Sequence, residues 1–168
     1  VTLKNILSHT TGYTFKGNAQ IEQGMPRAKL LNEIKREKPK YKPGKHYSYS
    51  NTLFSLVEEA LNMKGSSLNA ALKNLRVALK TDGIQMVPFN SSLPVAYPHI
   101  DGKSLPFPPY YPKAAPAGAG IFASLDAMIE ILKLSSGYRS DLISPKSRDL
   151  LYTPLISNND LYKWNIRL

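Results

Sequence analysis

The chain has 168 residues, of which 42% are hydrophobic and 20% charged, and this composition is typical of one folded domain with a hydrophobic core. It contains no cysteine, which excludes disulfides, thiolate metal sites and a thiol nucleophile. No apolar run approaches the roughly 18 residues of a membrane-spanning helix. The formal net charge is +10, but the basic residues are dispersed and no nucleic-acid-binding motif accompanies them. We therefore expect a solvated basic surface, with attraction to an anionic envelope or to nucleic acid as the alternative.

The first 38 residues predict two short helices joined by a loop. Thr2 is placed to cap a helix whose apolar residues have helical spacing and which ends before Gly12. Residues 13–25 are polar and interrupted by glycine, so we expect a loop there. Pro26 stands where a first helical residue would, and a charged helix is expected to end near Lys38.

The strongest helical periodicity comes after a turn at 39–44. Its apolar residues fall at i, i+3, i+4, i+7 and i+8 and are Leu53, Leu56, Val57, Ala60 and Leu61. Gly65 ends this helix, and Ser66 or Ser67 caps the next one.

Residues 81–120 are rich in proline and glycine, most densely between Pro88 and Pro116. An irregular segment of this length is expected either to carry function or to pack as a cover. Four aromatic side chains interleaved with proline suit either role, and we favour the cover over the helices; they are Tyr97, Phe107, Tyr110 and Tyr111. The stretch 99–102, with Asp-Gly at its bend, predicts a hairpin turn.

Two capped helices and a strand are expected in the last third. Ser124 begins a helix with Leu125, Met128, Ile129 and Leu132 directed inward, and Ser144-Pro145 begins a short one with Leu150 and Leu151 buried. Residues 162–168 alternate as a half-buried strand without a partner. The predicted fold is therefore mainly α, with long irregular loops and an isolated C-terminal strand.

Generic catalytic and metal sites find little support. His9, His46 and His99 stand far apart without the spacing of a metal site, so we expect no metal and no cofactor. The segment Ala117-Gly118-Ala119-Gly120 is only a weak match to a phosphate-binding loop. No GxSxG elbow is present.

One polar cluster precedes the strongest helix. Pro43-Gly44 turns the chain into a short extended segment, which brings Tyr49, Ser50 and Asn51 to a helix start. In the simpler interpretation, Ser50 or Asn51 only caps the helix and Tyr49 packs on the core. In the functional interpretation, the phenol and the amide face a reacting group.

Three segments favour the functional interpretation through a resemblance. Residues 1–13 (VTLKNILSHTTGY) resemble the ITLRHLLSHTSGL motif of class C β-lactamases, related DD-peptidases and esterases. Residues 43–51 (PGKHYSYSN) resemble the PGxxFxYSN element of that family. Tyr97, Asp101-Gly102 and residues 116–128 resemble its Y…DG…PAGGLFSTAxDM stretch, and all three occur in the family's order.

The resemblance implies the helical region of an α+β serine hydrolase. In such enzymes a serine of an S-x-x-K motif is acylated, the lysine and a tyrosine share the proton transfers, and an asparagine holds the substrate. It implies that Tyr49 is the general base and Asn51 the positioning amide. Tyr47 fits the aromatic packing position, and Ser50 has no certain role.

Two departures from the family pattern limit activity. No serine is followed by lysine three positions on, and Lys80-Thr81-Asp82-Gly83 is not a K-T-G motif, because Asp82 is inserted and the place is wrong. An ordinary tyrosine has a pKa near about 10 and needs nearby cations to act as a base. We therefore expect 1–168 to be a single domain, the central helical region of a β-lactamase-like hydrolase, without its nucleophile and inactive alone.

Several functional expectations follow from the resemblance. The parent is expected to act through an acyl-enzyme on a β-lactam, a D-alanyl peptide or a small ester, in the periplasm or cell envelope. The alternative is a catalytically inactive binding or scaffolding module that grips cell-wall peptide or a partner protein. Exposed apolar surface could make the chain self-associate, and we expect no nucleic-acid partner.

Overall fold

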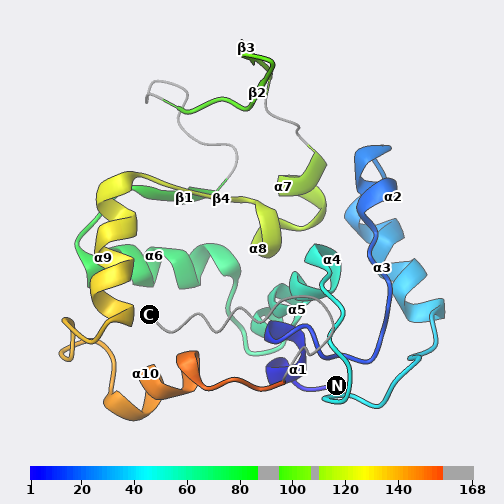
Figure 1. The fold of residues 1–168 in the computed structure, drawn as a ribbon, viewed down its shortest axis with the longest axis horizontal. Helices are drawn as coiled ribbons and strands as arrows, with labels where there is room; N and C mark the ends of the chain where they lie inside the picture. The colour runs from blue at the N-terminus through cyan, green and yellow to red at the C-terminus, as the bar shows by residue number, and fades with distance from the viewer. Residues whose placement is uncertain (87–94, 107–109, 157–168) are drawn as a thin grey trace.

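The computed structural model describes residues 1–86, 95–106 and 110–156, and it is mainly helical as predicted (Figure 1). Its helices are α1 (Leu3–Leu7), α2 (Asn18–Glu22), α3 (Arg27–Arg36), α4 (Asn51–Phe54), α5 (Val57–Asn62), α6 (Leu68–Leu79), α7 (Tyr110–Ala114), α8 (Pro116–Ala119), α9 (Leu125–Ser135) and α10 (Pro145–Tyr152). Its strands are β1 (Ile84–Met86), β2 (His99–Ile100), β3 (Lys103–Ser104) and β4 (Ile121–Ala123). The predicted strand at 162–168 lies outside the described residues.

Side-chain capping explains where several of the described helices begin. Thr2 and Asn5 form a reciprocal capping box at α1, and Ser67 caps α6. Ser124 and Ser144 accept backbone N–H donors at the starts of α9 and α10. These predicted starts are confirmed because each depends on one side chain and the turn that follows it.

The prediction of loop over 13–25 is wrong at 18–22, where α2 forms. Gly17 adopts a left-handed conformation with φ 72° and directs the chain into this short helix. Ile21 of α2 is fully buried in a core cluster with Leu30, Ala114 and Ala115. Tertiary burial of one isoleucine therefore stabilises a helix that its polar sequence does not predict.

The helix predicted over residues 53–61 is divided into α4 and α5. Two backbone bonds at the junction span three residues instead of four: Leu56 N–H donates to the Leu53 carbonyl, and Glu58 N–H to the Ser55 carbonyl. Ser55 itself is completely buried. This tight turn directs Ser55 toward α8, and the contact between them forms part of the site described below.

Two small antiparallel pairs form the sheet structure. β2 and β3 make the predicted hairpin, with Asp101 and Gly102 both at positive φ. β1 pairs with β4, Ile84 opposite Ala123, which the sequence did not predict because the two strands are far apart along the chain. Ile84 joins a second core cluster with Leu79 and Ala127, so this pair fastens α6 to α9.

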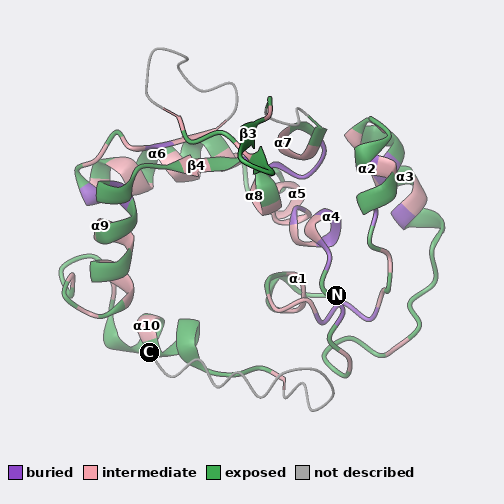
Figure 2. Cartoon of the chain, turned by 45° about the horizontal axis from the view of Figure 1, so that its top comes forward, coloured by how far each residue is buried: buried purple, intermediate pink, exposed green. Residues whose placement is uncertain are grey.

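The apolar residues predicted to face inward from α9 and α10 are exposed, contrary to prediction, and Figure 2 colours much of both helices as exposed. Leu125 is 76% exposed, and Leu150 and Leu151 are 65% and 66% exposed; Met128, Ile129 and Leu132 are exposed as well. Only Ala127 of α9 is fully buried. Periodicity identified an apolar stripe correctly, but no described element covers it. None of the described helices is long and apolar enough to cross a membrane.

Candidate active site

Tyr49 and Asn51 lie together at the start of α4. The Tyr49 hydroxyl donates to Asn51 Oδ1 at 2.8 Å, and the tyrosine is 49% exposed rather than packed into the core. Between them, Ser50 is buried and its Oγ accepts the Leu53 N–H at 3.2 Å. Ser50 is thus the cap, which leaves the side chains on either side of it available to solvent.

The turn after α1 supports this segment from one side. His9 accepts the Ser48 N–H with its carbonyl at 2.8 Å, and its ring lies 4.4 Å from the Tyr49 ring. Gly12 follows with φ 90°, and its carbonyl accepts the Lys40 and Tyr41 N–H groups. The His-Thr-Thr-Gly turn at residues 9–12 therefore supports the segment that carries Tyr49.

A second turn, at Lys16-Gly17, fixes the other side. The Lys16 carbonyl accepts the Ser50 and Thr52 hydroxyls at 3.3 and 3.1 Å. Lys16 Nζ donates to the Tyr49 carbonyl at 2.6 Å and to Ser48 Oγ at 3.3 Å. One lysine thus holds the segment through its backbone and its side chain.

The segment Pro116–Gly120 packs against α4. Gly118 N–H donates to Ser55 Oγ at 3.0 Å, and a Cβ on Gly118 would lie 3.0 Å from the Asn51 carbonyl oxygen. Ala117 N–H donates to Glu58 at 3.1 Å. Residues 116–120 of the third segment singled out in the sequence therefore meet the first two segments around residues 49–51.

Arg27 ties the surrounding helices together. Its guanidinium donates to the Ala114 carbonyl at 2.9 Å, to the Ser55 carbonyl at 3.0 Å and to Glu59 at 2.9 Å. Burial raises the pKa of the neighbouring Glu58 carboxyl, and Arg27 opposes this rise. Sequence reasoning missed Lys16, Arg27 and Glu58, because their partners lie dozens of residues away and no local motif marks them.

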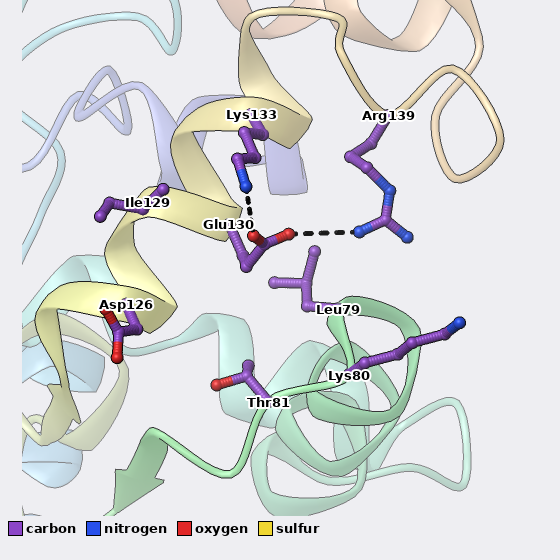
Figure 3. Close-up of a pocket in the computed structure, with 8 residues that line it drawn as sticks. All are labelled: Leu79, Lys80, Thr81, Asp126, Ile129, Glu130, Lys133 and Arg139. Carbon is purple, nitrogen blue, oxygen red and sulfur yellow. Dashed lines mark hydrogen bonds and ion pairs between the residues drawn. The ribbon is translucent and has the colours of Figure 1, made fainter.

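The remaining candidates lie elsewhere. Lys80 and Thr81, which superficially resemble a K-T-G motif, line a pocket of about 480 Å³ between α6 and α9, on the far side of the molecule from α1 and α4 (Figures 1 and 3). In this pocket Glu130 pairs with Lys133 and Arg139 at 2.7 and 3.4 Å, and the Lys133 bond chiefly lowers the pKa of the carboxyl. Of the two acidic residues that line this pocket, Asp126 and Glu130, Glu130 is thus already paired.

The histidines and the aromatic residues of the proline-rich segment are dispersed. His46 stacks on Tyr41 at 3.9 Å, and His99 Nδ1 lies 2.7 Å from the Tyr97 carbonyl. Within residues 1–86, 95–106 and 110–156, no three His, Asp or Glu side chains gather to hold a metal ion. Tyr111 packs on the first core cluster, as a cover would, whereas Tyr97 and Tyr110 are exposed; Phe107 lies outside the described residues.

Comparison with known proteins gives one family match. Searching the curated proteins found no match. A family model, Beta-lactamase, matches residues 1–161, which is nearly the whole chain. The chain therefore belongs to the Beta-lactamase family.

Proposed function

We propose that Tyr49 and Asn51 form half of the acyl-transfer site of a serine hydrolase. The observation that carries this proposal is the 2.8 Å hydrogen bond between a solvent-accessible phenol and an amide, on a segment held by two turns. Membership of the Beta-lactamase family indicates a serine-hydrolase-like fold and small substrates. Within that class we propose a β-lactam, a D-alanyl peptide or a small ester.

The chemistry assigns a separate task to each side chain. In acylation, Tyr49 acts as the phenolate, after losing to solvent the proton that it donates to Asn51 in this structure; the serine oxygen bonds to the acyl carbon, and the serine proton passes to the Tyr49 phenolate oxygen. The bond to the leaving group then breaks, and the proton returns to that group. The Asn51 amide Nδ2 is a hydrogen-bond donor and holds the substrate carbonyl, whereas Oδ1 accepts the Tyr49 hydroxyl in this structure.

The nucleophile must come from another segment of the gene product, because no serine here begins an S-x-x-K motif. We expect the 168-residue chain alone to leave nitrocefin unhydrolysed. Mass spectrometry after incubation with a labelled penicillin should show no added mass. A stoichiometric acyl adduct on this chain would overturn the assignment of the serine to another segment.

The decisive experiment uses the complete product of the encoding gene. Acylation by a penicillin, a D-alanyl peptide and a p-nitrophenyl ester is followed by mass spectrometry and stopped-flow absorbance. Tyr49→Phe should slow acylation by about 100-fold or more, the range expected for removing a general base. Tyr47→Phe is the matched control, since that ring also contacts His9, and should change the rate by less than about threefold.

Two outcomes would contradict the proposal: no acylation by any of the three substrates, or equal rates for Tyr49→Phe and Tyr47→Phe. The first outcome, combined with binding of cell-wall peptide, would favour the inactive binding module. The observation that supports the inactive binding module is the absence of an S-x-x-K motif from these residues. Finding the motif in the remaining gene product would count against the module.

A further inference from the structure

The backbone of His9 is held in an unusual conformation next to the candidate site. His9 has a positive φ of 55°, which few residues other than glycine adopt. Its N–H donates to the Ile6 carbonyl at 3.2 Å, and its carbonyl accepts the Ser48 N–H at 2.8 Å. The conformation thus directs the imidazole toward the segment that carries Tyr49.

The imidazole contacts that segment with both its face and a nitrogen. The ring centroid lies 4.4 Å from Tyr49, 5.4 Å from Phe54 and 5.8 Å from Tyr47. The Ser50 N–H donates to His9 Nδ1 at 3.3 Å. A nitrogen that accepts this bond carries no proton, so the ring is neutral with its hydrogen on Nε2.

The surroundings of the ring favour this neutral form. Burial lowers the pKa of His9 below its ordinary value of 6.5, and the Lys16 ammonium lowers it further. The titratable groups that face the imidazole are the phenols of Tyr47 and Tyr49 on the segment before α4 and the Lys16 ammonium on the turn before α2. From α4 it meets the uncharged ring of Phe54.

We propose that His9 is a pH-dependent positioning residue, which holds Tyr49 beside Asn51 while its imidazole is neutral and releases it when the imidazole is protonated. Protonation places a hydrogen on Nδ1, directly opposite the Ser50 N–H that it now accepts. It also adds a second cation near Lys16. Both effects act on residues 48–51, so the Tyr49 ring moves and the 2.8 Å bond to Asn51 weakens in acid.

This proposal rests on the proposed function in one respect only, namely that Tyr49 is catalytic. The coupling between His9 protonation and the position of Tyr49 is measurable in this chain without any substrate. Carbon-labelled His and Tyr side chains are followed by NMR from about pH 8 to about pH 5, across the range in which histidine titrates. We expect His9 to titrate with a midpoint below 6.5 and the Tyr49 ring signals to shift with the same midpoint. Tyr138, which is exposed after α9, should not follow that midpoint.

Two variants separate coupling from a general effect of acid. His9→Phe keeps an aromatic ring against Tyr49 but cannot titrate, so the pH-dependent shift of Tyr49 should disappear. His46→Gln removes the histidine that stacks on Tyr41 and should leave that shift unchanged. A Tyr49 signal that ignores the His9 titration, or that still shifts in His9→Phe, would overturn the proposal.

Should His9→Phe fail to fold, the matching of midpoints in the unsubstituted chain still decides. Failure of this coupling and failure of the proposed function are distinguishable. Uncoupled titration with a Tyr49-dependent acylation would remove the role of His9 and leave that of Tyr49. Coupled titration without any acylation would leave the role of His9 in positioning Tyr49 and remove the catalytic role of Tyr49.

Discussion

Gly12 has a conformation and a neighbour that both demand glycine. Its φ is 90°, and a Cβ there would overlap the Tyr41 carbonyl oxygen. Gly65 has a similar φ of 71° but no atom within 4 Å of an added Cβ. Substitutions at Gly12 and Gly65 therefore separate the effect of backbone strain from that of steric overlap.

We predict that Gly12→Ala lowers the free energy of unfolding by about 2–4 kcal/mol, because overlap adds to strain. Gly65→Ala, which has the strain alone, should lower it by about 1 kcal/mol. Urea unfolding followed by circular dichroism measures both. Equal losses would show that the Tyr41 carbonyl moves away without penalty.

His9 also makes the stability of the fold depend on pH. Its pKa in the folded chain lies below the 6.5 of the unfolded chain, so the unfolded state binds the proton more readily. The contribution is complete above about pH 6.5 and falls as the pH drops from there to the folded value. We predict that the unfolding free energy of His9→Phe declines less over this window than that of the unsubstituted chain. Parallel declines in urea titrations at several pH values would contradict it.

Only part of the candidate site was predictable at this scale. Tyr49 and Asn51 were identified because their motif is contiguous. Lys16 and Arg27 were not, because Lys16 acts on a carbonyl 33 positions away and Arg27 on one 87 positions away. Such pairings are decided by how the turns fold back, which no local spacing encodes.

Among the helices, α3 is connected to three neighbours by one side chain. Arg27 is only 19% exposed, and it contacts the end of α7, the α4–α5 junction and the α5 carboxylates Glu58 and Glu59. Removing its guanidinium would leave two carbonyls and a half-buried carboxylate without this donor. The helices are therefore expected to lose their relative placement together.

We predict that Arg27→Ala lowers the free energy of unfolding by about 2–3 kcal/mol, since buried acceptors lose a charged donor. Arg148→Ala is the control, because Arg148 pairs with its exposed neighbour Asp149 and should change stability by less than about 0.5 kcal/mol. Thermal unfolding of the two variants under one set of conditions gives the comparison. Similar losses for both would show that the Arg27 contacts add nothing net.

Helix starts could be read from the sequence far better than helix faces. Ser124 and Ser144 fix their helices through bonds within one turn. Whether Leu125 or Leu150 is buried depends on what packs against α9 and α10, and the expectation of burial was wrong. Similarly, Ile21 stabilises α2 through a cluster whose other members come from α3, from α7 and from Ala115, which joins α7 to α8.

At the scale of the molecule, and among the described residues, exposed apolar side chains are most numerous on α9 and α10, and two more lie on α1. A groove of about 680 Å³ between α1 and α10 is lined mainly by apolar residues, including Leu3, Leu7, Leu150 and Leu151. Surfaces of this kind are expected to associate in water. The chain alone should therefore form concentration-dependent oligomers.

Sedimentation velocity over a range of concentrations tests this prediction. Replacing Leu150 and Leu151 together by Gln should shift the distribution toward the monomer. Met63→Gln is the control, because Met63 is 87% exposed after α5 but lies outside the groove, and it should leave the distribution unchanged. A chain that is monomeric at every concentration would contradict the expectation.

The antiparallel pairing of β1 with β4 fixes both ends of the long connection between these two strands. Everything inserted between Met86 and Ile121 begins and ends at neighbouring backbone positions. Closure entropy grows slowly with loop length, by about 0.6 kcal/mol for each doubling. Evolution can therefore lengthen, shorten or exchange the part of this connection that precedes α7, while Ala114 and Ala115 keep their places in the first core cluster. Insertions at the Asp101-Gly102 turn between β2 and β3 are accordingly expected to leave the rest of the chain folded.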